Sequence, residues 1–208
     1  MALTKIQGSG ISGGVNLKAI NGTYTGGLLI EDDSNTTKSA ITHVVGTMAI
    51  SANASADHML ITADGEVTKP AQPAFCVVPA SQQSNIATDG YVDIAFGTEI
   101  YDVGGNFASN VFTAPVTGKY QLSYQLYCLA IDSAASYVDF QIDTSNRDYF
   151  NLLDPDAFDQ DAETWTWVLS ITADMDANDT AKVRFYQGGG TAQLDVSTAS
   201  FFTGVLIC

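Results

Sequence analysis

Hydrophobic and polar residues alternate along one stretch of the chain, which begins at Tyr120 and runs for nine residues, 120–128. Tyr120, Leu122, Tyr124, Leu126 and Cys128 share one parity, and the positions between the first four of these are glutamine or serine. A period of two places alternate side chains on opposite faces of a strand. The pattern therefore predicts a strand with one buried, strongly aromatic face, around which the C-terminal part of the chain is organised.

Further short apolar runs follow one another through the C-terminal part, separated by turn residues such as Asp89-Gly90 and the three glycines at 188–190. Many short strands at this spacing are typical of a β-sandwich or barrel. We therefore predict an all-β fold. The expected strands are 74–78, 91–96, 98–102, 106–113, 119–130, 136–142, 147–152, 163–172, 180–187, 191–196 and 200–207.

The first 70 residues read differently. Residues 1–20 are rich in glycine and serine, which predicts a segment that is mobile or ordered by something it binds. Short strands are expected at 27–30, 41–46, 47–51 and 58–62, followed by a hairpin turn at Asp64-Gly65. These strands are too short and sparse for a robust monomeric core, so we expect this module to wrap around copies of itself.

Two prolines in residues 69–73 favour an extended linker, which divides the chain into an N-terminal module, 1–70, and a C-terminal domain, 71–208. The net charge of −15 is unevenly shared between them, at −2 and −13. Binding of phosphate groups requires lysine and arginine, so we expect neither nucleic acid nor an anionic membrane as a partner.

The opening residues contain no apolar run, and no later stretch is long enough to span a bilayer. We therefore expect no signal peptide and no membrane insertion. Cys76, Cys128 and Cys208 lack the spacing of metal ligands, which predicts free, half-buried thiols in a reducing compartment.

A family resemblance is found at Phe112, Gly118, Tyr120, Leu122 and Tyr124, whose types and spacing resemble the signature of the complement component one q globular head. That family belongs to the tumour-necrosis-factor-like jelly rolls. Leu122 stands where its pattern normally has an aromatic residue. The chain end, with phenylalanines followed by a glycine and aliphatic residues, is similar to the family's closing strand.

This resemblance covers about residues 74–208 and implies a ten-stranded jelly-roll β-sandwich that forms tight trimers, with no catalytic residues. It places six residues in the core or the trimer interface. These are Tyr120, Leu122, Tyr124, Leu126, Phe201 and Phe202.

A second resemblance covers the residues that lead into this domain. A strand, a turn and a strand ending in Thr68-Lys69-Pro70 are similar to bacteriophage fibre and virion-appendage proteins, as is the opening run of residues 1–6. The resemblance implies that residues 1–70 form a small β or extended module that attaches the protein to other virion proteins, of the capsid or tail.

Candidate chemistry is concentrated in an acidic stretch with Asp154, Asp156, Asp159 and Asp161. Closely spaced carboxylates repel one another, and three outcomes remain open: a solvated loop, a calcium site at Asp154, Asp156 and Asp159, or a pair of glycosidase carboxylates. Calcium is the one cofactor that these residues suggest. No catalytic residue is predicted, because neither His43 nor His58 lies in a catalytic or metal-binding motif.

Trp165 and Trp167 follow the acidic stretch and share one parity. They either pack in the core or a subunit interface, or they stack on sugar rings at an exposed tip. Together with Asp154, Asp156, Asp159 and Asp161 they are the candidate ligand-binding residues.

These observations favour a non-enzymatic structural virion protein of a bacteriophage, assembled in the host cytoplasm. It would be a trimeric fibre or appendage whose jelly-roll head binds a host-surface glycan or protein. One alternative is a capsid decoration or head-fibre protein that stabilises the shell. Another is a non-viral, soluble recognition module of the complement-head type, and a third is a polysaccharide depolymerase.

Overall fold

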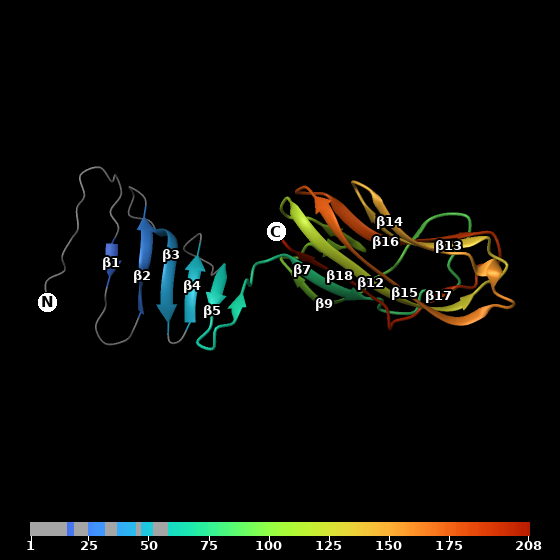
Figure 1. Cartoon of the computed structure of the whole chain (residues 1–208), viewed down its shortest axis with the longest axis horizontal. Helices are drawn as coiled ribbons and strands as arrows, with labels where there is room; N and C mark the ends of the chain where they lie inside the picture. Colours follow the sequence, from blue (N-terminus) through green and yellow to red (C-terminus); the bar gives the residue numbers. More distant parts are fainter. Residues whose placement is uncertain (1–15, 19–24, 32–36, 45–46, 52–57) are drawn as a thin grey trace. The chain divides into compact units, whose positions relative to one another are not determined.

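The computed structural model describes residues 16–18, 25–31, 37–44, 47–51 and 58–208. The chain divides into two compact units, Met1–Gln72 and Pro73–Cys208 (Figure 1). Each unit is considered by itself.

The first unit contains a six-stranded antiparallel sheet in which each strand pairs with the next along the chain. Its strands are β1 (Asn16–Lys18), β2 (Thr25–Glu31), β3 (Thr37–Val44), β4 (Thr47–Ser51), β5 (Met59–Ile61) and β6 (Val67–Thr68). The strands predicted after residue 26 are confirmed. Of the segment 1–20, which the sequence predicts to be mobile or ordered by a partner, only residues 16–18 are among the described residues.

The predicted hairpin between β5 and β6 is also present. The Gly65 backbone N–H donates to the Thr62 carbonyl at 3.1 Å, and the Thr62 N–H donates to the Glu66 carbonyl at 2.9 Å. Gly65 has a φ of +96°, in the left-handed region that glycine adopts without a steric cost. The turn therefore requires glycine at this position.

Little apolar surface is buried among the described residues of this sheet. Ala49, at 7% exposed, is the one apolar residue there that is fully buried, whereas Ile41 is 42% and Val67 57% exposed. The residues of β5 are only half-buried. Within the described part of the unit, no second layer covers the sheet.

The second unit is built from two six-stranded sheets. The first has the order β15 (Ala162–Met175), β12 (Gly118–Ile131), β18 (Phe201–Leu206), β7 (Ala74–Val78) and β9 (Thr98–Val103), with β17 (Asp195–Val196) added beside β12. The second has the order β10 (Phe107–Ala108), β11 (Val111–Thr113), β16 (Thr180–Gly188), β13 (Tyr137–Thr144) and β14 (Asp148–Leu153), with β8 (Val92–Asp93) added beside β16.

The chain passes repeatedly from one sheet to the other. After β12 in the first sheet it forms β13 and β14 in the second, returns for β15, crosses to β16, and ends in the first sheet with β18. Antiparallel strands with these crossing connections make a jelly-roll sandwich (Figure 1). The predicted all-β jelly-roll fold is confirmed.

Strand β12 is central, as its pattern predicts. It pairs along its length with β15 on one side and with β18 on the other. Tyr120, Leu122, Tyr124 and Leu126 are 0% exposed, and they meet Phe140 and other apolar residues of β13 and β16 across the sandwich. The Tyr124 hydroxyl donates to the Phe140 carbonyl at 3.1 Å, which satisfies its polar group inside the core.

Three expected strands are shorter than predicted, two because side chains replace strand neighbours as hydrogen-bond partners and one because the chain turns within it. Residues 91–96 form only β8, since the Ala95 N–H donates to the Gln83 side chain and the Phe96 N–H to Asn110. Residues 106–113 are a hairpin of β10 and β11, because Ser109 and Asn110 both have positive φ. In the expected 191–196 strand the Thr191 N–H donates to Asp132, so only β17 forms.

Candidate functional site

The outer face of the first sheet carries no charged side chain over its central rows. This surface, called the neutral face, is defined by the outward positions of four strands. They are Thr166, Val168, Ser170 and Thr172 on β15, Gln121, Ser123, Gln125 and Tyr127 on β12, Phe201, Thr203 and Val205 on β18, and Ala74, Cys76 and Val78 on β7.

Small polar side chains on this face bond to one another. The Ser123 and Ser170 hydroxyls lie 2.7 Å apart, and the Gln121 amide donates to the Ser170 hydroxyl at 2.7 Å. Val168 on β15 and Val205 on β18, the strands on either side of β12, are 58% and 41% exposed. Residues 71–208 carry a net charge of −13, so a face without charge is the surface that a second copy can approach at the least electrostatic cost.

The core residues predicted from the family resemblance fall into two groups. Tyr120, Leu122, Tyr124, Leu126 and Phe202 point between the two sheets and belong to the core of a single chain. Phe201 has the opposite parity, is half-buried, and lies on the neutral face. Only Phe201 of the six is therefore placed to contact another subunit.

The two tryptophans share one parity but have different environments. Trp167 is 2% exposed and packs against Phe140 with ring centroids 4.8 Å apart, so it is a core residue and cannot be a surface platform for a ligand. Trp165 is 40% exposed and lies 5.6 Å from the Phe158 ring. Trp165 and Phe158 form the aromatic tip.

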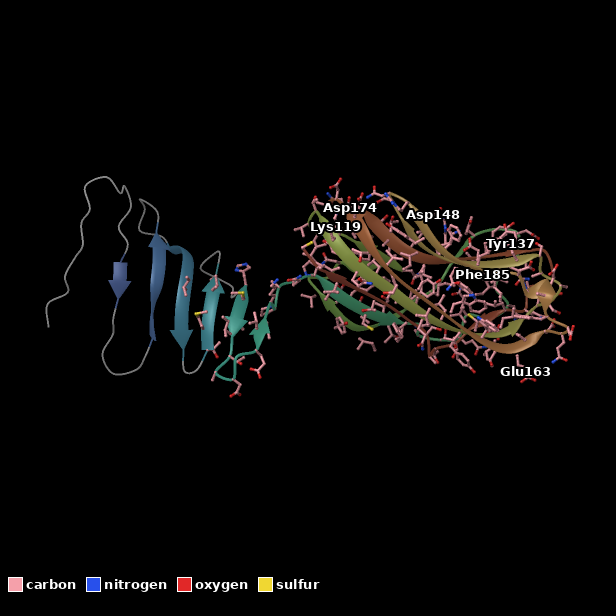
Figure 2. All side chains as sticks on the ribbon, viewed as in Figure 1. Lys119, Tyr137, Asp148, Glu163, Asp174 and Phe185 are labelled. Carbon is pink, nitrogen blue, oxygen red and sulfur yellow. The ribbon has the colours of Figure 1, made fainter. Side chains whose placement is uncertain are left out.

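The aromatic tip lies at the end of the sandwich opposite to the point where the chain enters it. The chain enters this unit at Pro73, whose carbonyl accepts a hydrogen bond from the Leu206 N–H at 3.0 Å. This bond lies close to the Lys119–Asp174 ion pair. Figure 2 shows Lys119 and Asp174 together at one end of this unit and Glu163, two residues before Trp165, at the other. The aromatic tip and the point where the chain enters this unit thus lie at opposite ends of it.

The acidic stretch forms a short 3₁₀ turn, Pro155–Ala157, with Asp154, Asp156 and Asp159 all exposed. The pKa of Asp156 is raised because its protonated carboxyl can donate a hydrogen bond to Asp154 and because Asp154 is negatively charged. Within the part of the chain that the structure describes, no three acidic, histidine or cysteine side chains are grouped to hold a metal ion. The three proposed calcium ligands are therefore not assembled as a site in this conformation.

Asp161 has a structural position that its sequence context does not reveal. Its carboxylate accepts hydrogen bonds from the Gln193 amide at 2.9 Å, and from the Ser133 backbone N–H at 2.9 Å and hydroxyl at 2.7 Å. These bonds lower the pKa of Asp161. The residue links two loops of the tip rather than offering a free carboxylate to a ligand.

A third surface escaped the sequence analysis. On the outer face of the second sheet, Arg184 pairs with Asp143 and Asp148 at 3.0 Å each and donates to Gln141 at 2.8 Å. The alternation within 137–143, with Asp139, Gln141 and Asp143 at every second position, is the signal that could have found it. Their partner Arg184 lies 43 residues beyond Gln141, so the network itself depends on tertiary structure.

All three cysteines carry free thiols, as predicted. Cys128 is buried, Cys76 is half-buried on the neutral face, and Cys208 is exposed. Burial raises the pKa of the Cys128 thiol, which keeps it protonated and unreactive. No helix among the described residues is long and apolar enough to cross a membrane.

No protein-family model matches the chain. No curated protein matches it either. Among solved structures, the globular domain of zebrafish complement 1qA protein aligns with a TM-score of 0.49 and 14% identity, covering 66% of this chain and 98% of that one. A crystal structure of murine APRIL at pH 8.0 aligns with a TM-score of 0.48 and 12% identity, covering 65% and 99%. The assignment of the jelly roll rests on the strand order described above.

Proposed function

We propose that this protein is a non-enzymatic, homotrimeric surface-binding protein, a structural component of a bacteriophage virion whose jelly-roll head binds a host-surface glycan or protein. The neutral face is the observation that carries the proposal. A head with a charge of −13 repels its own copies, and this repulsion is weak across a surface of valine, serine, threonine and glutamine.

The first unit supports the same assembly. Its described sheet leaves Ile41 and Val67 exposed and buries little apolar surface of its own. Packing against two further copies would cover this surface. The trimer would thus be joined through both units, with the N-terminal segment available to dock on other virion proteins, of the tail or the capsid.

The aromatic tip suits the role of a recognition surface. Trp165 and Phe158 present ring surface at the end of the head that lies away from the chain entry, with exposed carboxylates around them. Three such tips on one trimer would multiply a weak interaction by avidity. Calcium binding by Asp154, Asp156 and Asp159 stays a prediction, which thermal unfolding with and without millimolar calcium would test.

Light scattering of the purified chain tests the assembly. We expect a mass three times the 22.0 kDa of one chain. Val205→Glu and Val168→Glu each introduce a carboxylate on the neutral face, and each should reduce the mass to that of a monomer because the buried like charges repel. Leu152→Glu, at a residue 57% exposed on the other sheet, is the matched control and should remain a trimer.

A folded wild-type chain that scatters as a monomer would contradict the proposal, as would glutamate variants that retain the trimeric mass. Circular dichroism of each variant establishes that the β fold is intact, so that a lost trimer is not mistaken for unfolding.

A further inference from the structure

The outer face of the second sheet carries a cluster of tyrosines beside a buried carboxylate. Tyr137 and Asp139 are alternate residues of β13, and Asp139 pairs with Tyr186 on β16. Tyr91 lies just before β8, which is added beside β16. This surface, called the tyrosine face, consists of Tyr91, Tyr137, Tyr186, Asp139 and Gln141.

The three tyrosine rings form a continuous surface. Tyr137 and Tyr186 are stacked, with ring centroids 5.2 Å apart and an interplanar angle of 18°, and Tyr91 lies 5.2 Å from Tyr186 at 51°. Tyr91 is 52% and Tyr137 37% exposed. Figure 2 shows Tyr137 on the outer side of the sheet and the core residue Phe185 nearer the middle of the sandwich. The exposed Tyr91 and Tyr137 rings therefore offer aromatic surface to solvent, and Tyr186 supports both of them.

Asp139 is recessed among these rings and is 5% exposed. One carboxylate oxygen, Oδ2, accepts a hydrogen bond from the Gln141 amide, whose nitrogen also donates to the Tyr91 hydroxyl at 2.9 Å. The other oxygen, Oδ1, is buried and has no hydrogen-bond partner among the described residues. A buried acceptor without a donor is costly, and a ligand that supplies the donor recovers that free energy.

The charges around the tyrosine face select against ionic ligands of either sign. The Arg184 guanidinium lies 4.1 Å from the centre of the Tyr91 ring and so already occupies its cation-binding face. A cationic ligand would meet this positive charge. An anionic ligand would meet Asp139 and the two carboxylates that pair with Arg184, Asp143 and Asp148. A neutral ligand meets neither obstacle.

We propose that the tyrosine face is a binding site for a neutral saccharide. The apolar C–H face of a sugar ring stacks on the Tyr137 ring, which Tyr186 supports by stacking, and one sugar hydroxyl donates a hydrogen bond to Asp139 Oδ1. The half-exposed Tyr91 side chain moves aside to admit that hydroxyl. This site extends the proposed host-surface binding, because it specifies a neutral saccharide as the ligand and adds a second binding surface to the aromatic tip. The inference rests on that proposed function.

Isothermal titration of the full chain with four neutral oligosaccharides (maltohexaose, cellohexaose, laminarihexaose and chitohexaose) tests the site. We expect at least one to bind. Tyr137→Ala should weaken that binding about tenfold by removing the platform, whereas Tyr137→Phe retains the ring and should change it less than about twofold. Asp139→Asn should also weaken binding about tenfold, because its amide oxygen bonds Gln141 and a donor replaces the free acceptor.

Tyr101→Ala, at an aromatic residue 48% exposed on β9 of the other sheet, is the control and should leave saccharide affinity unchanged. The proposal is overturned if none of the four sugars binds at about 10 mM, or if binding survives both Tyr137→Ala and Asp139→Asn. It is also overturned if tetramethylammonium binds the face in place of a sugar. Host adsorption that is lost with Trp165→Ala but unaffected by Asp139→Asn would reject this site while leaving the proposed function intact.

Discussion

Several carboxylates in this acidic head accept hydrogen bonds from backbone N–H groups. Asp195 accepts from the Asn85 N–H at 2.7 Å, and Asp102 accepts from the N–H groups of Asn106 and Phe107 at 3.0 and 2.8 Å. The Asp179 carboxylate receives the Asp176 N–H at 2.8 Å. Aspartates of this kind satisfy loop N–H groups that have no strand neighbour, which accounts for part of the acidic composition without any ligand.

Asp139 is the exception, and its titration should be visible in folding stability. Burial raises the pKa of its carboxyl, while hydrogen bonding by Gln141 and the charge of Arg184 act in the opposite direction. The folded chain therefore holds this proton more tightly than the unfolded chain does. The protonated Asp139 carboxyl contributes fully to folding stability below the ordinary carboxyl pKa, and this contribution is lost as the pH rises through the raised pKa.

Asp139→Asn should accordingly increase the free energy of unfolding by about 1 kcal/mol at neutral pH, and the gain should shrink as the solution is acidified. Urea unfolding at about pH 7 and pH 4, at one protein concentration, measures it. Asp174→Asn removes an ion pair whose carboxylate is 73% exposed and should change stability little. A destabilised Asp139→Asn at neutral pH would contradict the burial argument.

Among the strands, the closing strand β18 shows why one glycine is required. Gly204 pairs with Leu122 on β12 and with Phe75 on β7, so its inward side faces the core between two neighbouring strands. A Cβ placed on Gly204 would collide with the Phe75 ring and lie 2.7 Å from the Leu122 side chain. The Phe75 ring stacks on Phe112 at 4.7 Å and is not free to move away. The glycine therefore makes space for an aromatic core residue.

Gly204→Ala should lower the free energy of unfolding by about 1–3 kcal/mol because the added methyl group overpacks the core. Thermal and urea unfolding measure this cost. Gly90→Ala is the matched control, since a Cβ there would meet no atom within 4 Å. Equal stability of the two variants would show that the Phe75 ring adapts and that the proposed constraint is absent.

At the scale of the whole molecule, the two units differ in how much apolar surface each one buries. The head has an extensive core of its own, from Phe75 to Phe202, whereas the described part of the first unit buries little. We therefore expect the head to fold and bind on its own surface, and the N-terminal unit to depend on its partners.

Deleting residues 1–25 should abolish incorporation into virus particles, because this segment is proposed to dock on other virion proteins. Gel electrophoresis of purified particles measures whether the truncated protein is incorporated. Deleting residues 73–208 distinguishes the two virion roles: loss of host adsorption indicates a fibre, whereas loss of shell stability indicates a capsid decoration protein. Normal incorporation of the 1–25 deletion would exclude the docking role.

Much of the fold was predictable because strand formation depends on local alternation and turn residues. The period of two in 120–128 identified the central strand and its buried parity, and the predicted strands of the second unit lie at or near the observed ones. The signals failed where a distant side chain replaced a strand neighbour, as Gln83 and Asn110 do for the backbone at Ala95 and Phe96. Such partners are brought near by the fold and leave no local pattern.

The sequence by itself determined the all-β class, the central aromatic strand and the acidic character of the head, since all three follow from residue type and parity. Only the tertiary structure decided which of the residues that share one parity along a strand are exposed to solvent. Trp165 and Trp167 are alike in sequence, but Phe140 of the second sheet packs on Trp167, whereas Trp165 remains 40% exposed. Asp139 likewise became a candidate site only when folding placed Tyr91, Tyr186 and Arg184 around it, because burial and electrostatics depend on neighbours in space.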